Sequence, residues 1–277
     1  MSSHRYIDTL PAQSPEDVKE KKIIILSLSR SGTAGLCAAL EQLGYKAYNM
    51  YRVQYYGYDH ARMFHEALRI KRTGEGKPYS RADFDKWTGD YDVLSIVPCY
   101  LAEEVIGAYP DAKYILTTRE PEAWARSVWN TIALLAEQSQ SFPLALYKHF
   151  DAMDLQYSRL VELIVDGLTR GRGRTAEGFA TAMEVYEDYN EKVKKLVPAD
   201  KLLAVKLEDG LGWEQLCPFL GVDVPATPYP RTNDTRQFQA RSKLFYQNGR
   251  RRFMRIMGTA AMLVVAAGLW YRRRPLL

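Results

Sequence analysis

Short apolar runs alternate along this chain with longer stretches in which apolar residues recur every three or four positions. The runs lie at residues 23–26, 45–50, 92–97, 113–118 and 202–205. Runs of this kind are typical of strands that are covered on both faces, as in a parallel sheet. Strands that alternate with helices predict an α/β fold, a three-layer parallel sheet with helices on both faces. In such a sheet a ligand binds at the carboxyl ends of the strands.

The stretches between the runs have the apolar spacing of helices. We expect a first helix that Gly44 ends, and further helices at residues 101–109, 122–136, 144–168, 179–197 and 213–220. Ser80 is a suitable N-cap for a short helix that carries Phe84 and Trp87.

The loop after the first run has the composition of an anion site. Residues 27–33 read Ser-Leu-Ser-Arg-Ser-Gly-Thr and connect the expected strand to the expected helix. A helix N-terminus in this position presents unpaired N–H groups and the positive end of the helix dipole, which suit a phosphate. A Walker A loop is excluded because no Gly precedes Gly32 by up to six residues, and Thr33, not Lys, follows it. The alternative is an ordinary turn whose Ser and Gly occur by chance.

A second candidate phosphate contact follows the run at residues 113–118. Arg119 comes at the carboxyl end of this expected strand, and Ser127 falls two turns into the next helix. A guanidinium can bind a phosphate monoester through two N–H groups, and a hydroxyl adds a neutral hydrogen bond. The spacing alone is a weak signal, and the upstream loop strengthens it.

Together these segments resemble the sulfotransferases that use PAPS (3′-phosphoadenosine 5′-phosphosulfate). The loop resembles the family's 5′-phosphosulfate loop, commonly Pro-Lys-Ser-Gly-Thr-Thr. It is closer to a branch that reads Arg-Thr-Gly-Thr and is often mislabelled as NAD-dependent epimerase/dehydratase. Arg119 and Ser127 resemble the family's 3′-phosphate motif. The resemblance continues in Trp-Glu-Gln-Leu-Cys-Pro-Phe-Leu-Gly at residues 213–221 and covers roughly residues 22–234.

The resemblance implies a P-loop NTPase-like sulfotransferase fold and transfer of a sulfuryl group from PAPS to a hydroxyl or amine, without a metal. Arg30 takes the role of the family's loop Lys and stabilises charge on the leaving phosphate. The residues that the resemblance assigns to the donor are Arg30, Ser31, Gly32, Thr33, Ala34, Arg119 and Ser127. Ala34 stands where the family often has a second hydroxyl.

The chain departs from the family at the general base. Members of this branch carry Asp two residues before a Pro at the end of a central strand; Pro98 marks that place, and Ile96 occupies the position. The branch also tends to carry His where this chain has Asn49. The general base is therefore not assigned. Ionisable or hydroxyl substitutes that lie nearby in the sequence are Ser95, His60, His65 and Glu103.

The C-terminal segment has the pattern of a membrane anchor. Residues 256–271 are uncharged and mostly apolar, and arginines flank them on both sides. Including residues 253–255, the segment is just long enough to span a bilayer, with Trp270 and Tyr271 at the interface. A single-pass, tail-anchored chain would leave the body facing the cytosol. The alternative is a buried C-terminal helix of the domain.

Charge and cysteine content limit the remaining classes. Residues 250–277 contain seven Arg and no acidic residue. Because the net charge of the whole chain of 277 residues is only +5, the remaining residues carry a slight net negative charge. That body offers no footprint for nucleic acid. Cys37, Cys99 and Cys217 lie far apart in apolar settings, and the four His show no metal-ligand spacing.

These patterns divide the chain into five parts. They are a flexible N-terminal arm at 1–20, a sulfotransferase-like α/β domain at 21–235, a connecting basic helix at 236–252, a transmembrane anchor at 253–271 and a basic tail at 272–277. The residues at 51–65 include many aromatic side chains, which suit either an apolar acceptor pocket or a packing face.

Three functions are compatible with the pattern. The first is a membrane-anchored sulfotransferase acting on a small, lipophilic acceptor. The second is a catalytically inactive relative that binds the nucleotide and acts as a membrane-tethered partner, as Ile96 and Asn49 suggest. The third is an unrelated P-loop enzyme such as a small-molecule kinase, which the missing Walker Lys and Mg²⁺ ligands disfavour. The sequence specifies neither the acceptor nor the oligomeric state.

Overall fold

A five-stranded sheet forms the centre of the body in this computed structural model, which describes residues 5–230, 238, 242 and 246–272. The strands are β1 (Ile23–Ile25), β2 (Ala47–Tyr48), β3 (Val93–Leu94), β4 (Lys113–Thr118) and β5 (Leu202–Lys206). Their order is β2-β3-β1-β4-β5, and every neighbouring pair is parallel. The predicted parallel α/β sheet is confirmed.

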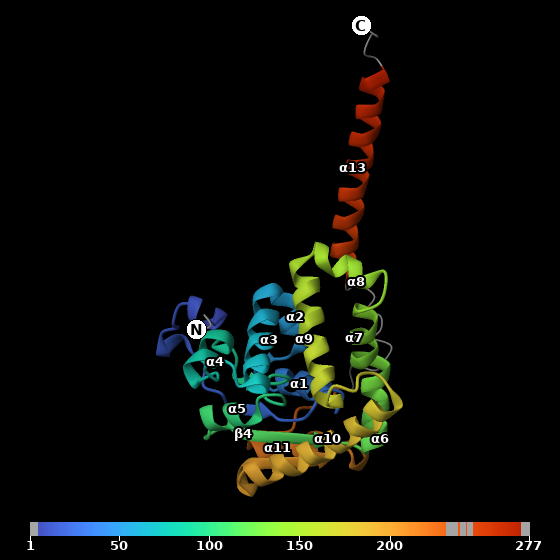
Figure 1. The fold of residues 1–277 in the computed structure, drawn as a ribbon. Helices are drawn as coiled ribbons and strands as arrows, with labels where there is room; N and C mark the ends of the chain where they lie inside the picture. The colour runs from blue at the N-terminus through green and yellow to red at the C-terminus, as the bar shows by residue number, and fades with distance from the viewer. Residues whose placement is uncertain (1–4, 231–237, 239–241, 243–245, 273–277) are drawn as a thin grey trace.

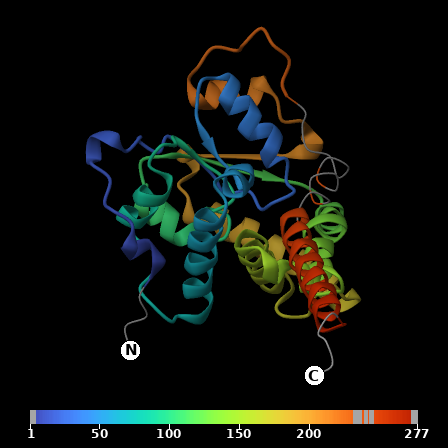
Figure 2. The ribbon, with the colours of Figure 1, turned by 90° about the horizontal axis from the view of Figure 1, so that it is seen from above.

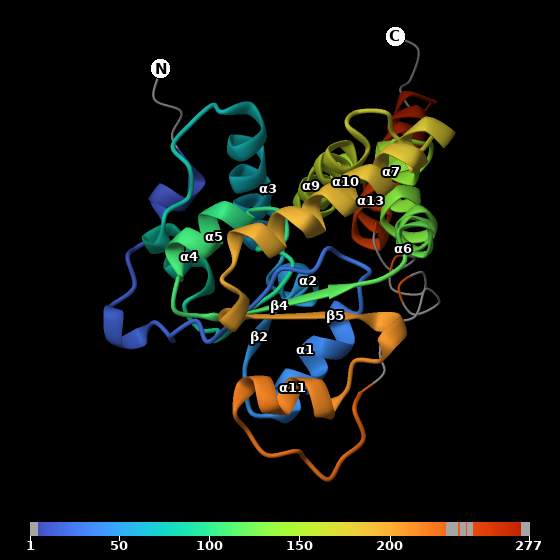
Figure 3. The ribbon, with the colours of Figure 1, turned by 90° about the horizontal axis from the view of Figure 1, so that it is seen from below.

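Helices cover both faces of the sheet (Figure 3). One face carries α1 (Thr33–Gln42) and α11 (Trp213–Leu220), and the other carries α3 (Tyr58–Thr73), α4 (Arg81–Thr88), α5 (Ala102–Ala108), α9 (Ala152–Thr169) and α10 (Ala176–Leu196). Successive residues of β1 serve the two layers, because Ile23 and Ile25 pack with α1 and α11 whereas Ile24 packs with the opposite core. This explains the unbroken apolar run, since side chains alternate across a strand.

The remaining elements are shorter helices and 3₁₀ turns. They are α2 (Met50–Tyr56), α6 (Pro121–Val128), a π-helical stretch at Trp129–Ala133, α7 (Leu134–Ser139), α8 (Leu144–Tyr147), and 3₁₀ turns at Tyr6–Thr9, Pro15–Asp17, Lys148–Phe150, Ala199–Lys201 and Leu207–Asp209. The predicted cap of α4 is present, because Ser80 and Asp83 form a capping box.

Two predicted segments differ from the structure. The single helix expected at residues 144–168 is wrong, because Asp151 is extended and separates α8 from α9; its carboxylate accepts the N–H groups of Met153 and Asp154 as an N-cap. The N-terminal segment expected to be flexible contacts the body in part, because Arg5 and Ile7 are buried whereas residues 11–17 are exposed. Ile7 is fully buried, and Arg5 pairs with Asp83 at 3.1 Å.

The last helix, α13 (Gln247–Arg272), rises away from the body beside α8 (Figure 1). The most apolar 18-residue window within Gln247–Tyr271 has a mean hydropathy of 1.6, and none of that window is buried. It is long and apolar enough to cross a membrane, and the alternative of a buried C-terminal helix is wrong. Residues 247–252 of the connecting helix expected at 236–252 belong to α13. Most of the earlier part of that helix lies outside the described residues, as does the tail at 273–277.

Candidate functional site

The loop between β1 and α1 is bent by two residues in the left-handed region. Arg30 has φ 75° and Gly32, the N-cap of α1, has φ 77°. The helical bonds begin with the Leu36 N–H, which donates to the Gly32 carbonyl, so the N–H groups of Thr33 and Ala34 precede the helical ladder. The loop after β1 thus leads to a helix N-terminus with free N–H groups, which we call the cradle. The strand–loop–helix order is the one predicted from the sequence.

The loop approaches its neighbour too closely for a larger residue. A Cβ built on Gly32 would lie 2.9 Å from Cδ2 of Leu207, in the turn that follows β5. Both the positive φ and this approach require Gly at the position. Ser31 faces away from the cradle: its N–H donates to the Leu28 carbonyl at 3.2 Å and its hydroxyl contacts that of Tyr186 at 3.3 Å.

Tyr186 of α10 joins this loop to the one after β4. Its hydroxyl accepts the N–H of Arg119 at 2.9 Å while it contacts Ser31. Its ring stacks on Trp124 at 4.2 Å, and the Trp124 indole N–H donates to the Ser29 carbonyl at 2.9 Å. The two loops that the sequence assigned to one ligand are therefore held together by buried hydrogen bonds and a ring stack.

Three of the residues predicted to bind the sulfuryl donor PAPS contact one another directly. Nη1 of Arg119 donates to the Arg30 carbonyl at 3.2 Å, and Nε of Arg30 donates to Oγ of Ser127 at 3.1 Å. The Nε of Arg119 is buried and has no hydrogen-bond partner among the described residues. A buried N–H of a permanent cation without an acceptor is costly, and an anion at this place would satisfy it.

A cavity of about 610 Å³ opens over these loops. Its polar end is lined by Ser29, Arg30, Gly32, Thr33, Ala34 and Arg119, and its apolar end by Ile132, Leu135, Tyr157, Val161 and Ile164. Ser31 and Ser127 do not line it. The polar end suits a phosphate-bearing ligand, and the apolar end, built by the π-helical stretch, α7 and α9, suits a hydrophobic one.

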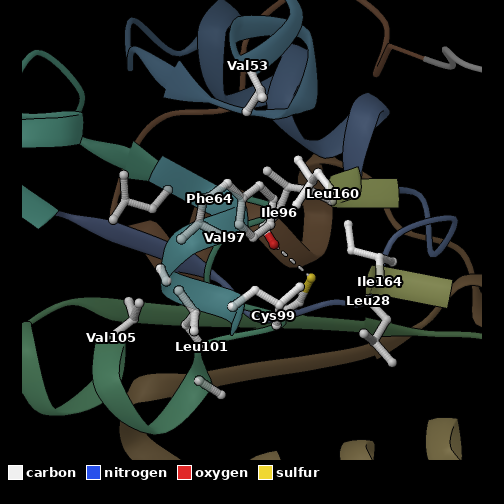
Figure 4. Packing of buried hydrophobic residues seen from close by; sticks show 14 of the residues in the cluster. Leu28, Val53, Phe64, Ile96, Val97, Cys99, Leu101, Val105, Leu160 and Ile164 are labelled. Atoms are coloured by element: carbon white, nitrogen blue, oxygen red, sulfur yellow. Dashed lines mark hydrogen bonds between the residues drawn. The ribbon is translucent and has the colours of Figure 1, made fainter. Parts of the chain in front are cut away.

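Ile96 lies in this cavity in a strained conformation. Its φ is 68°, and the Val97 N–H donates to the Ser95 carbonyl at 2.9 Å, which closes a tight three-residue turn. A β-branched residue in this region is an outlier. Its side chain joins the buried cluster with Phe64 and Leu160, and its carbonyl accepts the Cys99 thiol at 3.0 Å (Figure 4).

The polar substitutes named from the sequence are mostly elsewhere. Glu103 pairs with Lys71 and Lys192, which helps to lower the pKa of that carboxyl to about 2 against the opposing effect of burial. His60 is half-buried among aromatic rings, and burial lowers its pKa to about 4. Neither these two nor His65 lines the cavity, whereas Ser95 does.

Asn49 lines the cavity and has a structural task. Its Oδ1 accepts the N–H groups of Tyr51 and Arg52 and caps α2. Burial raises the pKa of the neighbouring Cys37 thiol to about 11, so this thiol stays protonated at neutral pH. The three cysteines are buried and free.

Sequence reasoning missed Glu41, the one carboxylate among the described lining residues. It lies on α1 at helical spacing from Thr33 and Cys37, which also line the cavity, and this spacing was the available signal. The eight residues from Thr33 place it about 12 Å along the helix, far from the cradle. It lies 3.7 Å from Arg52. In the part of the chain that the structure describes, no group of three His, Cys, Asp or Glu could hold a metal.

Comparisons with known proteins identify the family of the chain. A family model described as "Sulfotransferase domain" matches residues 22–238. A protein of Aspergillus versicolor, "Ava biosynthesis cluster protein M", is 31% identical over 262 residues, which are 92% of this chain and 98% of that protein. The crystal structure of a sulfotransferase from Alicyclobacillus acidocaldarius aligns over 87% of this chain and 97% of its own at 15% identity, with a TM-score of 0.43.

Proposed function

Because the chain belongs to the sulfotransferase family, we propose that it transfers a sulfuryl group from PAPS to a hydroxyl or amine of a small, lipophilic acceptor. The family model and the relative confirm the family resemblance seen in the sequence. The identity of the sulfuryl donor and the class of acceptor are what we propose. The observation that supports it is that the two loops assigned to phosphates meet at one end of a cavity whose other end is apolar.

The residues present suit a donor with two phosphates. We assign the 5′-phosphate to the N–H groups of Thr33 and Ala34 and to the hydroxyl of Thr33, at the positive end of α1. We assign the 3′-phosphate to Arg119 and Ser127. The partnerless Nε of Arg119 supports this assignment, because a phosphate oxygen would give it the acceptor it lacks.

Arg30 would act on the leaving group. In the reaction the bond from sulfur to the 5′-phosphate oxygen breaks, and a bond from sulfur to the acceptor oxygen or nitrogen forms. Negative charge grows on the phosphate oxygen, and the guanidinium of Arg30 lies at the loop to stabilise it. The acceptor loses its proton, and adenosine 3′,5′-bisphosphate and the sulfated acceptor are the products.

The cavity favours acceptors that need little help from a base. Among the described lining residues Glu41 is the one carboxylate, and the others near the loops include Ser95, Asn49, the aliphatic Ile96 and Tyr100, whose hydroxyl contacts that of Ser29 at 3.2 Å. A phenol or enol, which ionises more readily than an alkanol, or a neutral amine would attack without a strong protein base. We therefore place phenolic, enolic or amine groups ahead of simple alcohols.

A catalytically inactive nucleotide-binding protein is the second candidate. Ile96 favours it, because the strained turn persists although its side chain cannot accept a proton. In that case the protein would bind adenosine 3′,5′-bisphosphate and PAPS, but PAPS would not be consumed with any acceptor. The exposed, apolar α13 would tether either form to a membrane with the body on the cytosolic side.

Calorimetry on the full chain in detergent micelles tests the donor site. We expect adenosine 3′,5′-bisphosphate to bind more tightly than adenosine 5′-monophosphate. Arg119→Ala should weaken the binding of the bisphosphate by about 10- to 100-fold, the loss expected for a hydrogen bond to a charged group. Arg126→Ala is the matched control, because this exposed Arg lies on the same loop–helix segment and pairs with the exposed Glu122. Equal binding of both nucleotides would refute the donor.

A further inference from the structure

A second cavity adjoins the candidate active site. Its volume is about 480 Å³, and it shares Leu135, Phe238 and Ser242 with the first cavity as common wall. It follows α7 through Leu134 and Gln138 to the corner between α7 and α8, where Phe142, Pro143 and Leu144 line it. The two cavities therefore lead from the phosphate-binding loops to the far end of α7.

This corner presents apolar side chains to its surroundings. Phe142 is 83% exposed and Leu146 of α8 is 37% exposed. Large apolar side chains held outward at the mouth of a cavity are unfavourable in water, and they are stabilised by contact with a hydrophobic phase.

The foot of α13 lies at the same corner (Figure 1). The Phe253 ring packs against Tyr147 at 5.4 Å and against Phe150 at 5.1 Å, measured between ring centroids. Viewed along its axis, α13 stands over the side of the body that holds α7 and α9 (Figure 2). A bilayer crossed by this helix would thus meet the mouth of the second cavity.

Direct bonds fix the direction in which α13 leaves the body. The Gly249 N–H donates to Oδ2 of Asp154 at 3.0 Å, and Arg252 pairs with Asp151 at 3.2 Å. A Cβ on Gly249 would lie 2.3 Å from the Tyr147 carbonyl oxygen, so the close approach depends on Gly. The junction is a packed contact with α8 and α9, not a free linker.

We propose that the acceptor is an amphiphile that enters from the bilayer through the second cavity and presents its nucleophilic group at Arg30. This inference rests on the proposed function, because it takes α13 as the anchor and the first cavity as the transfer site. The occupant carries an apolar body, which Leu134, Leu135 and Leu144 contact. It also carries polar groups along that body, because Asn130 and Gln138 line the same passage.

Photocrosslinking in membranes tests the route without requiring turnover. The full chain is reconstituted in phosphatidylcholine vesicles that contain an alkyne-tagged, diazirine-bearing long-chain alkylphenol. After illumination we expect labelled peptides from residues 130–144 and from α9, in addition to α13. Labels on α13 alone would overturn the route, and so would extraction of the chain from the vesicles by alkaline carbonate.

Two variants make the test specific. Phe142→Asp should reduce labelling of residues 130–144 by about tenfold, since a Phe side chain gains roughly that factor on burial in an apolar phase. Val224→Asp is the matched control, because Val224 is 58% exposed and does not line either cavity. Leu135→Trp should block the passage between the two cavities at their shared wall, so that labelling of α9 falls and labelling at Phe142 remains. Equal labelling in wild type and both cavity variants would contradict the proposal.

Nucleotide binding keeps the two proposals distinguishable. Adenosine 3′,5′-bisphosphate affinity is measured on the same vesicles. Cavity labelling without nucleotide binding would remove the donor assignment and retain a lipid route. Nucleotide binding without cavity labelling would remove the route and retain the donor site.

Discussion

Arg30 donates a hydrogen bond from Nε to Oγ of Ser127 at 3.1 Å, although the sequence assigned these side chains to opposite phosphates of the donor. The contact crosses 97 residues of sequence and joins the loop after β1 to α6. The Arg30 guanidinium also lies over the Phe238 ring at 5.4 Å. The two segments that the sequence assigned to different phosphates are therefore joined through one guanidinium.

Ser127 gives the first prediction. Ser127→Ala should weaken adenosine 3′,5′-bisphosphate by about 5- to 10-fold, the usual loss of one hydrogen bond, while adenosine 5′-monophosphate binds as before. Titration calorimetry of both nucleotides measures the difference. A loss of the same size for both would show that Ser127 serves the loop through Arg30 and not the 3′-phosphate.

Gly32 gives the second prediction. Gly32→Ala should lower the free energy of unfolding by about 2 kcal/mol, through its positive φ and through contact with Leu207. Gly44→Ala is the control, because Gly44 has φ 87° but no atom within 4 Å of the added Cβ, so it should lose about 1 kcal/mol. Urea unfolding compares them, and equal losses would mean that the Leu207 contact is harmless.

Ile96 gives the third prediction. Ile96→Asp should raise the turnover of PAPS with an alkanol by about 100-fold, because a carboxylate would then stand where the family places its base. The pH profile of the variant should gain an acidic limb. Ile96→Asn, which also tolerates positive φ but accepts no proton, is the control. If Asn raises the rate as much as Asp, relief of strain and not proton transfer is responsible.

His60 gives the fourth prediction, on stability. The Tyr48 hydroxyl lies 2.8 Å from Nδ1, and the Trp87 indole N–H points to the same nitrogen at 3.3 Å, so Nδ1 acts as an acceptor. Burial lowers the pKa of His60 to about 4, below its usual value near 6.5. Between these values the unfolded chain binds a proton that the folded chain does not, and stability falls as pH falls.

Because the ring is only half-buried, we expect this group to cost about 1 to 2 kcal/mol of unfolding free energy between pH 7 and pH 4. Urea unfolding of wild type and His60→Gln at both pH values isolates the contribution, since other acidic groups titrate in both proteins. Parallel decreases in the two proteins would show that His60 titrates normally.

The sheet was predictable because its physical cause lies in local sequence. The three Ile of β1 face both layers of helices, and burial of successive residues leaves an unbroken apolar run. The run at 113–118 coincides with β4, and the helix predicted at 213–220 coincides with α11, which Gly221 ends in the left-handed conformation. These signals act within a few residues of the element they specify.

What the sequence did not predict depends on distant partners. Asp151 interrupts the apolar spacing of residues 144–168 only weakly, and its pairing with Arg252 appears only when α13 is in place. The N-terminal arm is held in part by Arg5, which donates a hydrogen bond to Asp83, 78 positions away in the sequence. The contact between Arg30 and Ser127 and the position of Glu41 follow likewise from how β1, β4 and α1 meet.

The bonded foot of α13 has a kinetic consequence. Because Gly249 is held to Asp154 and packed on Tyr147, a body anchored through α13 as proposed would have little freedom to turn its cavities away from the membrane. Encounter between the protein and a membrane-dissolved acceptor would then become a search in two dimensions. The rate would follow the mole fraction of acceptor among the lipids and fall on surface dilution, even when the total amount of acceptor per volume of solution is unchanged.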